Sequence, residues 1–283
     1  MRYTRAEVLA RLQAEIDAGR PVIGAGAGTG ISAKFAEAGG ADLIIIYNSG
    51  RFRMAGHGSL AGVLAYGDAN QIVQEMGERE VLPVVKEVPV IAGVMGTDPL
   101  RQMPVLLRQL DALGFSGINN FPTVGLIDGR FRMELEATNM GFGREVDMIR
   151  TAREMGFFTA VYVFNPDESR AMADAGADCI IAHMGLTVGG SIGLDRSDAL
   201  SLEDAPAAVQ AIGEAAWAVN RAAILLCHGG PIATPQDSAY VLANSDAVGF
   251  VGASSMERLP VETAITGTVE AFKQASFRKH MKS

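Results

Sequence analysis

Eight short apolar segments are spread along the 283-residue chain, and they constrain its fold more than any other feature. Each is rich in Val, Ile, Ala and Leu, and each is followed by Gly or polar residues and then by a stretch with helical periodicity. The segments are almost continuously apolar, which is typical of parallel strands buried on both faces beneath helices. We expect strands at residues 21–26, 43–48, 90–93, 117–121, 158–163, 179–183, 224–228 and 247–252.

The intervening stretches predict helices, and several of them end at a glycine suited to the left-handed conformation: Gly19, Gly39, Gly114, Gly156 and Gly176. Eight such strand–helix units close into a barrel more naturally than they lie flat. The sequence therefore predicts one α/β domain over residues 1–283, a (β/α)8 TIM barrel with an N-terminal capping helix. A doubly wound open sheet is the alternative. We expect helices at residues 4–17, 32–38, 69–81, 102–113, 145–155, 167–175, 202–219, 237–243 and 261–274.

The charge balance points to a small ligand. The net charge of −8, from 24 basic and 32 acidic residues, offers no positive field to nucleic acid or to an anionic membrane. No apolar stretch approaches the roughly 20 residues of a membrane span, and the start of the chain lacks a signal-peptide core. We expect a cytoplasmic protein whose two cysteines, Cys179 and Cys227, are buried thiols.

In such a barrel, only residues at the carboxyl ends of strands and in the loops that follow them reach the active site. Two arginines after the second strand have guanidinium groups that can bind a carboxylate or phosphate through paired hydrogen bonds. Solvated arginines or an oligomer contact are the alternative. The ligand-binding candidates from the first, second and fourth strands are Gly26, Asn48, Ser49, Arg51, Arg53 and Asn119.

Small residues follow the seventh and eighth strands, where TIM barrels commonly hold a phosphate group. Their backbone N–H groups can point at an anion, and two serine hydroxyls add donors. We therefore expect a phosphate or carboxylate to bind there, with ordinary tight turns as the alternative. The residues are Gly229, Gly230, Gly252, Ala253, Ser254 and Ser255.

His183 and His228 end the sixth and seventh strands, so they should lie side by side at the active face. An imidazole there can act as an acid or base near neutral pH. We expect His183 to move a proton, assisted by His228 or by Asp98 after the third strand. A structural imidazole bonded to a loop carbonyl is the alternative. Metal ligation by the histidines is less favoured, because no carboxylate accompanies them in a recognised spacing.

Two glycine-rich motifs and two long connections are weaker indications of function. Residues 28–33 match a relaxed dinucleotide fingerprint, but no acidic residue ends the next strand to hold a ribose. Residues 189–193 match the form of a nucleophile elbow without its strand–turn–helix context, so a mobile loop is the better interpretation. The connections 48–69 and 120–142 are long enough to be lids or interfaces.

With these residues identified, the chain resembles the phosphoenolpyruvate hydrolase-like TIM-barrel family, related to the phosphoenolpyruvate mutase and isocitrate lyase barrels. The resemblance implies a hydrolase of a small phosphorylated or 2-oxo acid, most concretely phosphoenolpyruvate or phosphonopyruvate, and a homo-oligomer assembled through barrel helices. It covers nearly the whole chain, through GAGAGTGISAKFAEAGGADLIIIYNSGRFRMAG, GVMGTDP, GFSGINNFPTVGLIDG, AGADCIIAHMG, LCHGGPI and GFVGASSMERLP.

The chain departs from the mutase-type relatives where they bind Mg2+. Those enzymes carry a D-x-D motif after the third strand and a glutamate after the fourth, whereas this chain has MGTD at residues 95–98 and two asparagines at 119–120. Mg2+ is the only cofactor that the resemblance implies. Asp98 is the one acid left at these places, so the Mg2+ site is incomplete. The missing acids favour a second hypothesis, a non-catalytic barrel that senses a similar metabolite in signal transduction.

Overall fold

The computed structural model describes residues 2–276 and shows a closed barrel of eight parallel strands. Each strand pairs with its neighbours in sequence, and β8 closes the barrel against β1, with Ala25 opposite Gly252 at the carboxyl end. The predicted TIM barrel is confirmed, and four strand ranges agree to the residue. The strands are β1 (Val22–Gly26), β2 (Leu43–Ile46), β3 (Val90–Gly93), β4 (Gly117–Asn119), β5 (Phe158–Val163), β6 (Cys179–His183), β7 (Ile224–His228) and β8 (Gly249–Gly252).

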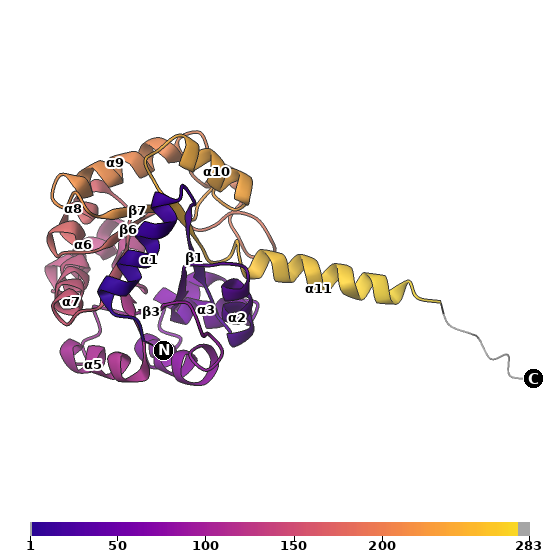
Figure 1. Ribbon diagram of the computed structural model, residues 1–283, viewed down its shortest axis with the longest axis horizontal. Coiled ribbons are helices and arrows are strands. Elements are labelled where there is room, and N and C mark those ends of the chain that lie inside the picture. Colours follow the sequence, from indigo (N-terminus) through magenta and orange to yellow (C-terminus); the bar gives the residue numbers. More distant parts are fainter. Residues whose placement is uncertain (1, 277–283) are drawn as a thin grey trace, which may run out of the picture.

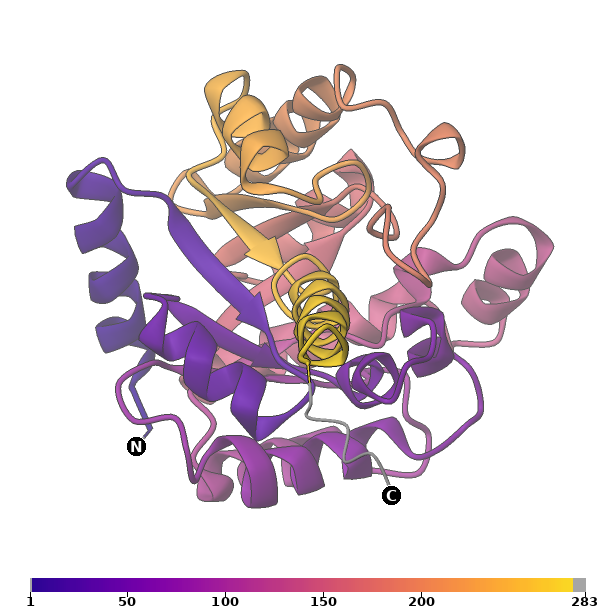
Figure 2. The same cartoon turned by 90° about the vertical axis from the view of Figure 1, so that its right-hand side faces the viewer.

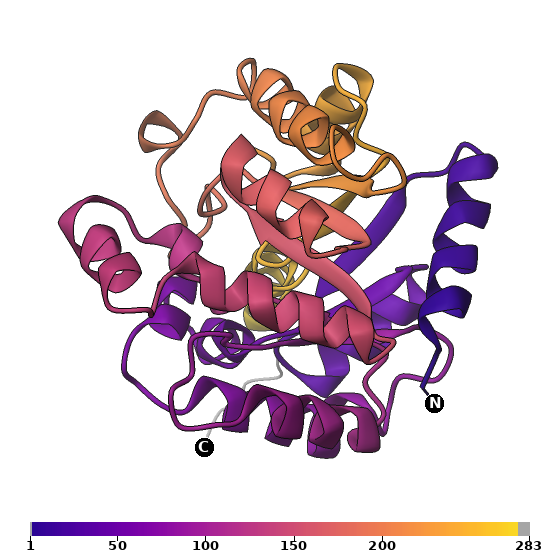
Figure 3. The same ribbon diagram turned by 90° about the vertical axis from the view of Figure 1, so that its left-hand side faces the viewer.

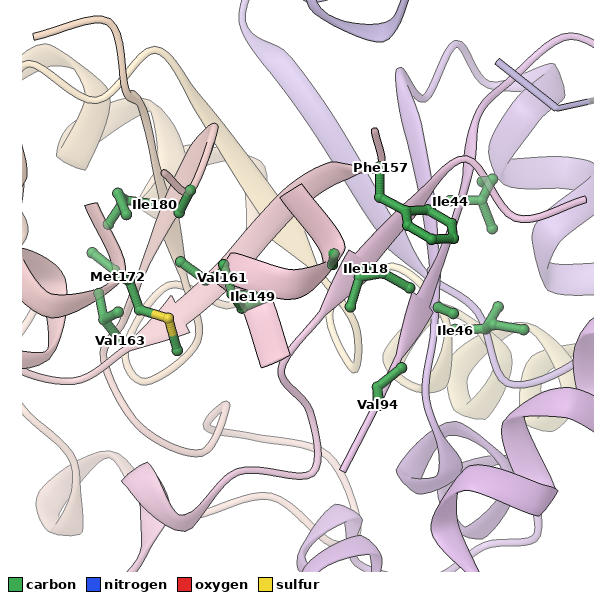
Figure 4. Close-up of a cluster of buried hydrophobic side chains, with 14 of the residues drawn as sticks. Ile44, Ile46, Val94, Ile118, Ile149, Phe157, Val161, Val163, Met172 and Ile180 are labelled. Atoms are coloured by element: carbon green, nitrogen blue, oxygen red, sulfur yellow. The ribbon is translucent and has the colours of Figure 1, made fainter. Parts of the chain in front are cut away.

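Helices form a ring around the strands (Figure 1). The main hydrophobic core lies between this ring and the outer face of the barrel, because alternate residues of each strand point outward. Figure 4 shows part of it, where Ile118, Val161 and Ile180 of the strands share one cluster with Ile149 and Met172 of the helices. The helices are α1 (Arg5–Asp17), α2 (Gly30–Ala38), α3 (Asn48–Met54), α4 (Ala69–Met76), α5 (Met103–Leu113), α6 (Gly129–Ala137), α7 (Phe142–Glu154), α8 (Pro166–Asp174), α9 (Ala205–Trp217), α10 (Pro235–Ala243) and α11 (Arg258–Lys273).

A second core fills the inside of the barrel. Ile45, Ile181 and Leu226 point inward from their strands, and Val8 and Leu12 of α1 close this core with no exposed surface. Figure 1 shows α1 lying across the barrel opening. The N-terminal capping helix is therefore confirmed.

The two long connections contain helices that the sequence analysis did not predict. Helix α3 lies in the first, and α6 lies in the second and stands apart from the ring (Figure 3). No residue of α6 is buried, so an apolar period could not reveal it. Its stabilisation comes instead from i,i+4 ion pairs, Arg130 with Glu134 and Arg132 with Glu136.

Most helix ends lie within three residues of the predicted ones, and two of them also differ in backbone conformation. The helix expected at 69–81 is regular to Met76 and continues as a wider π turn over Gly77–Val81. Gly39 has a right-handed φ of −79°, and its neighbour Gly40 takes the left-handed role with a φ of 91°. The other four predicted glycine ends have positive φ.

Helix α11 also lies outside the ring. It projects away from the barrel (Figure 1), and Figure 2 looks along its axis from the far end. Arg258, its first residue, is the one buried residue of this helix. None of the helices within residues 2–276 is both long enough and apolar enough to cross a membrane.

Candidate functional site

A cavity of about 40 Å3 lies at the carboxyl ends of the strands. We call it the pocket. Its floor is aromatic and its rim combines one arginine with hydroxyl groups. It is lined by Tyr47, Ser49, Arg53, Ser59, Leu60, Phe121, Leu126, Tyr162, His183, Gly185, Leu186, Thr187, His228, Ala253 and Ser254.

The floor is made by Tyr47, Phe121 and Tyr162, which point inward from the second, fourth and fifth strand–loop units. Tyr47 continues the inward row of β2 that begins with Leu43 and Ile45. The two tyrosine hydroxyls lie 3.5 Å apart. Burial raises the pKa of both phenols, so these hydroxyls stay protonated and can donate a hydrogen bond.

His183 and His228 lie opposite each other in the pairing of β6 with β7, and their ring centroids are 4.5 Å apart. Nδ1 of His183 accepts a hydrogen bond of 3.0 Å from the Gly185 backbone N–H, which leaves the proton on Nε2. Nδ1 of His228 lies 2.6 Å from the Val251 carbonyl oxygen and must carry its proton there, which leaves Nε2 as an acceptor. The pair therefore presents one donor and one acceptor.

Both imidazoles are neutral at physiological pH. Burial lowers the pKa of His228 to about 4, and burial together with the neighbouring His228 lowers the pKa of His183 well below its ordinary value. A neutral His228 with a free Nε2 is the form that a general base requires.

Arg53 is the one cation in the lining of the pocket. Its Nε and Nη2 donate to the same oxygen of Glu257, at 2.9 and 2.6 Å, and the other Glu257 oxygen accepts the Gly28 backbone N–H at 2.6 Å. The side chains of Arg53 and Glu257 are 1% and 2% exposed. The pairing compensates a charge that would otherwise be costly to bury, and it fixes the guanidinium at the pocket wall.

Several donors face the pocket without a protein acceptor. In the part of the chain that the structure describes, the hydroxyls of Ser49, Thr187 and Ser254 make no hydrogen bond to protein, although all three residues are buried. The backbone N–H groups of Ala253 and Ser254 likewise donate to no protein group within residues 2–276. Together with Arg53, these groups make an anion-binding rim.

The glycines after β7 have a steric role and are not among the lining residues of the pocket. Gly229 and Gly230 have φ values of 72° and 56°, and a Cβ on either would collide with backbone atoms of Met184 or Gly185. The Gly230 N–H is already bonded to the Gly185 carbonyl oxygen at 2.7 Å. These glycines let the loop after β7 pack on the loop after β6, so they shape the pocket without lining it.

Other predicted site residues lie around the pocket rather than in it. Gly26 lies inward beneath it, because a Cβ there would meet the Tyr47 hydroxyl. Asn48 and Asn119 are buried with amide groups bonded to the carbonyls of Gly62 and Ala160. Gly252 and Ser255 do not appear among the lining residues.

Arg51 and Asp98 lie away from the two histidines of the pocket. Arg51 lies on the outside, where it pairs with Glu75 and Glu80. Asp98 lies in a separate polar depression with Arg101 and Arg144. Its carboxylate accepts hydrogen bonds from Asn70, Arg101 and the Leu100 backbone, which lower its pKa despite partial burial.

Tyr162, Glu257 and Thr187 belong to the site although the sequence analysis gave none of them a role. Tyr162 lies within an apolar strand, so its inward direction depended on strand register. Glu257 follows the small residues of the loop after β8, and an acid so close to an expected anion site was a signal of a buried ion pair. Thr187 lies in a glycine-rich loop without any pattern.

A buried carboxyl group holds the loop after β4. Glu145 of α7 is fully buried and accepts hydrogen bonds from the Asn120 amide at 2.7 Å and the Val124 N–H at 2.8 Å. Asn120 in turn bonds the backbone N–H and carbonyl of Tyr162. Burial raises the pKa of Glu145 to about 8. The residue therefore positions the pocket floor from behind.

The site does not fit the Mg2+ that the family resemblance implies. Within residues 2–276, no group of three or more His, Cys, Asp or Glu side chains is placed to bind a metal ion. The acid that sequence analysis offered, Asp98, already pairs with Arg101. The pocket rim instead presents a cation and N–H or O–H donors, which suit an anion.

Comparison with known proteins gives a family and a fold. A family model described as phosphoenolpyruvate hydrolase-like matches residues 7–275. A phosphonopyruvate hydrolase solved in complex with oxalate and Mg++ superposes with a TM-score of 0.58 at 20% sequence identity, over 94% of this chain and 86% of that one. At this identity the likeness concerns the barrel alone.

Two curated relatives are longer proteins. The chain is 61% identical over 273 residues to the "ToMV susceptible protein tm-1(GCR26)" of Solanum lycopersicum, covering 96% of this chain and 36% of that protein. It is 37% identical over 274 residues to y4pA of Sinorhizobium fredii (strain NBRC 101917 / NGR234), named as a candidate transcriptional regulatory protein, covering 96% and 44%. The chain thus spans between about a third and a half of these relatives.

Proposed function

We propose that this chain, which belongs to the phosphoenolpyruvate hydrolase-like family, is an enzyme that acts on a small phosphorylated or 2-oxo acid. Phosphoenolpyruvate and phosphonopyruvate are the most concrete substrates. The observation that carries the proposal is the complementary histidine pair beside Arg53 in one pocket. An anion held by the rim would lie next to both an acid and a base.

In this proposal the rim binds the two negative ends of the substrate. Arg53 holds the carboxylate, and the Ser254 hydroxyl with the N–H groups of Ala253 and Ser254 holds the phosphoryl group. The cavity of about 40 Å3 suits a small group. A three-carbon phosphorylated acid is larger than this cavity, so in this proposal its binding requires the loop after β6, which carries Gly185 and Thr187, to move outward.

The histidines then carry the protons. Nε2 of His228 takes a proton from a water molecule as its oxygen attacks phosphorus and the bond to the enol oxygen breaks. Nε2–H of His183 donates a hydrogen bond to that oxygen as it gains negative charge. The proton from water ends on the enolate carbon, so one phosphoenolpyruvate and one water give pyruvate and inorganic phosphate. This assigns the base to His228, where the sequence alone favoured His183.

The experiment is a phosphate-release assay with phosphoenolpyruvate and with phosphonopyruvate, in EDTA and in Mg2+. We expect turnover in EDTA, because the chain's donors replace the metal. The His228→Gln variant should lose roughly 10²–10⁴-fold in kcat with a small change in substrate affinity. His57→Gln, on the exposed surface, is the matched control and should keep full activity. No turnover on either substrate, or full activity of His228→Gln, would refute the proposed enzyme activity.

A second candidate function is a metabolite sensor. Two observations favour it: the absence of an acidic metal cluster among residues 2–276, and the name of the Sinorhizobium fredii relative, which refers to regulation. A sensor would be stabilised against heat by a phospho- or 2-oxo acid without converting it. Thermal-shift measurements run beside the turnover assay separate the two functions.

We further propose that the chain works as a homo-oligomer. Helix α11 exposes Ile265, Val269 and Phe272 to solvent at 60%, 55% and 77%. Contiguous apolar surface of this kind is typical of protein interfaces. Light scattering at micromolar concentration should report a mass well above the 29.8 kDa of one chain.

A further inference from the structure

Helix α6 stands apart from the ring (Figure 3) and buries no residue, yet one of its side chains contacts two segments of the barrel. The side chain of Arg132 is 21% exposed. Its Nη1 donates to the carbonyl oxygens of Val124 and Ile127 at 2.9 and 3.4 Å, and its Nη2 donates to Glu168 at 3.0 Å. The guanidinium therefore joins α6 to the loop after β4 and to the first turn of α8.

The contact with Glu168 leads to the backbone of Phe164, the residue directly after β5. The side chain of Glu168 is 7% exposed, and its second carboxylate oxygen accepts the Phe164 N–H at 3.0 Å. Within residues 2–276, Arg132 is the one cation that pairs with Glu168. The ion pair thus compensates a nearly buried carboxylate and keeps it in place as the acceptor of this N–H.

The contact with the loop after β4 leads to the ring of the same phenylalanine. A Cβ on Gly125 would lie 2.4 Å from the Phe164 ring, so the ring packs directly against the backbone of this loop. The preceding residue, Val124, has both backbone groups fixed, because its N–H bonds to Glu145 and its carbonyl oxygen bonds to Arg132. Arg132 therefore reaches Phe164 by two routes, one to its backbone and one to its ring.

Phe164 in turn packs on His183. The centroids of the two rings are 4.6 Å apart, and their planes differ by 32°. Tyr162 and His228 meet the same imidazole at steeper angles of 72° and 65°. Of these three rings, Phe164 lies closest to parallel with the imidazole. The plane of His183 sets the direction of its Nε2–H, so Phe164 helps to fix the direction in which this group donates.

We propose that Arg132 is a positioning residue for the pocket. Through Glu168 and the loop after β4, it holds Phe164 against His183 and so directs the Nε2–H donor. The proposal rests on the proposed function, in which this N–H meets the oxygen that gains negative charge. Arg132 is not among the lining residues of the pocket, so it acts on the chemistry only through its neighbours.

This role differs from that of an ordinary surface ion pair, and α6 provides the comparison. Arg130 makes the same kind of i,i+4 pair, with Glu134, but its side chain is 87% exposed and bonds to no other group within residues 2–276. Removing either arginine takes one such pair from α6. Only the removal of Arg132 also leaves Glu168 without its cation. The two arginines therefore give a matched pair of variants.

The position of Phe164 is tested without any ligand, so this test can fail separately from the proposed enzyme. In Arg132→Met, amide exchange at Phe164, followed by NMR, should be about tenfold faster than in the wild type. The ring-proton signals of His183 should shift, because the aromatic ring beside them moves. Arg130→Met should change neither readout. Wild-type exchange and wild-type signals in Arg132→Met would overturn the proposal.

Two further variants separate the two routes. Arg132→Met/Glu168→Gln keeps a neutral acceptor for the Phe164 N–H and should slow its exchange again, whereas exchange as fast as in Arg132→Met would overturn the route through Glu168. Gly125→Ala displaces the Phe164 ring without removing a charge, and it replaces Arg132→Met if that variant does not fold. The His183 signals should shift in Gly125→Ala, and unmoved signals would overturn the link from Phe164 to His183.

The consequence for the chemistry is tested in the phosphate-release assay. In Arg132→Met we expect kcat to fall roughly tenfold to a hundredfold, because small misplacements near reacting atoms are costly, while KM changes less than about twofold, since Arg53 is untouched. Arg130→Met should keep the wild-type kcat. A raised KM at constant kcat in Arg132→Met, or equal kcat in the two variants, would overturn the role in catalysis. A wild type without turnover would refute the proposed enzyme, and the NMR readouts would still decide whether Arg132 positions Phe164 and His183.

Discussion

The two mouths of the barrel use buried polar groups in opposite ways. At the N-terminal mouth, Asp178 receives the Arg5 guanidinium at 2.7 Å and the Thr159 N–H at 3.1 Å, and the Tyr3 N–H bonds the Ser116 hydroxyl. At the carboxyl mouth, His228 and Ser254 keep an unused acceptor and an unused donor facing a cavity. The same eight strands thus end in a closed seal on one side and in an open chemical site on the other.

Because of this difference, we expect stability and ligand binding to depend on opposite ends of the barrel. The polar groups of the N-terminal mouth bond to one another beneath the apolar plug, which is formed by the buried side chains of α1. Substitutions there should therefore change only the free energy of unfolding. The polar groups of the carboxyl mouth are held by neighbouring groups while one atom of each stays free. Substitutions there should therefore change ligand binding. The Arg53–Glu257 pair is the point where the two roles meet.

The largest effect should come from Arg53→Met. It leaves Glu257 buried without its cation, which should cost roughly 3–5 kcal/mol in the free energy of unfolding and abolish binding of phosphoenolpyruvate. The double variant Arg53→Met/Glu257→Gln removes the orphaned charge and keeps an acceptor for Gly28. We expect it to regain much of the stability in urea unfolding and none of the affinity by calorimetry. A double variant that binds normally would remove Arg53 from the site.

A change at the opposite mouth should spare the ligand. Leu12→Ala opens a cavity in the fully buried plug and should destabilise the fold by about 3 kcal/mol. Substrate affinity at a temperature where the variant is folded should match that of the wild type. Loss of affinity in this variant would show that the two mouths are coupled.

Acid should destabilise the carboxyl mouth. The pKa of His228 is about 4 in the folded chain and about 6.5 in an unfolded one. Its contribution is therefore complete above pH 6.5 and is lost as the pH falls from 6.5 towards 4, by about 3 kcal/mol. His228→Gln lacks this titration, so urea unfolding at pH 7 and pH 4.5 should show a smaller acid loss for the variant. Parallel pH profiles would contradict the burial of a neutral imidazole.

The smallest effect should come from Arg51→Ala, the matched partner of the Arg53 change. Arg51 is half-exposed and pairs with Glu75 and Glu80 on the surface. Such pairs contribute about 0–1 kcal/mol. We expect near-normal urea unfolding and unchanged substrate affinity, and a clear loss of affinity would return Arg51 to the site.

Much of the fold was readable because burial on both faces leaves a continuous apolar signal. The strands β3, β5, β6 and β7 were predicted to the residue. Helix α6 was not, because it buries no residue and so carries no apolar period. The position of His183 beside His228 was also predictable, since adjacent parallel strands end at the same edge.

The sequence by itself determined the barrel, its cap at the N-terminal mouth and the strand ends that carry chemistry, because these depend on periodicity and chain order. Tertiary structure decided which candidates share a cavity. Arg53 and Arg51 lie two residues apart, yet the turn of α3 sends one inward to Glu257 and the other outward. The direction of α11 was likewise decided by contacts distant in sequence, from Arg258 to Gly189 and from Glu257 to Gly28. Such contacts follow from packing in three dimensions, which no local pattern records.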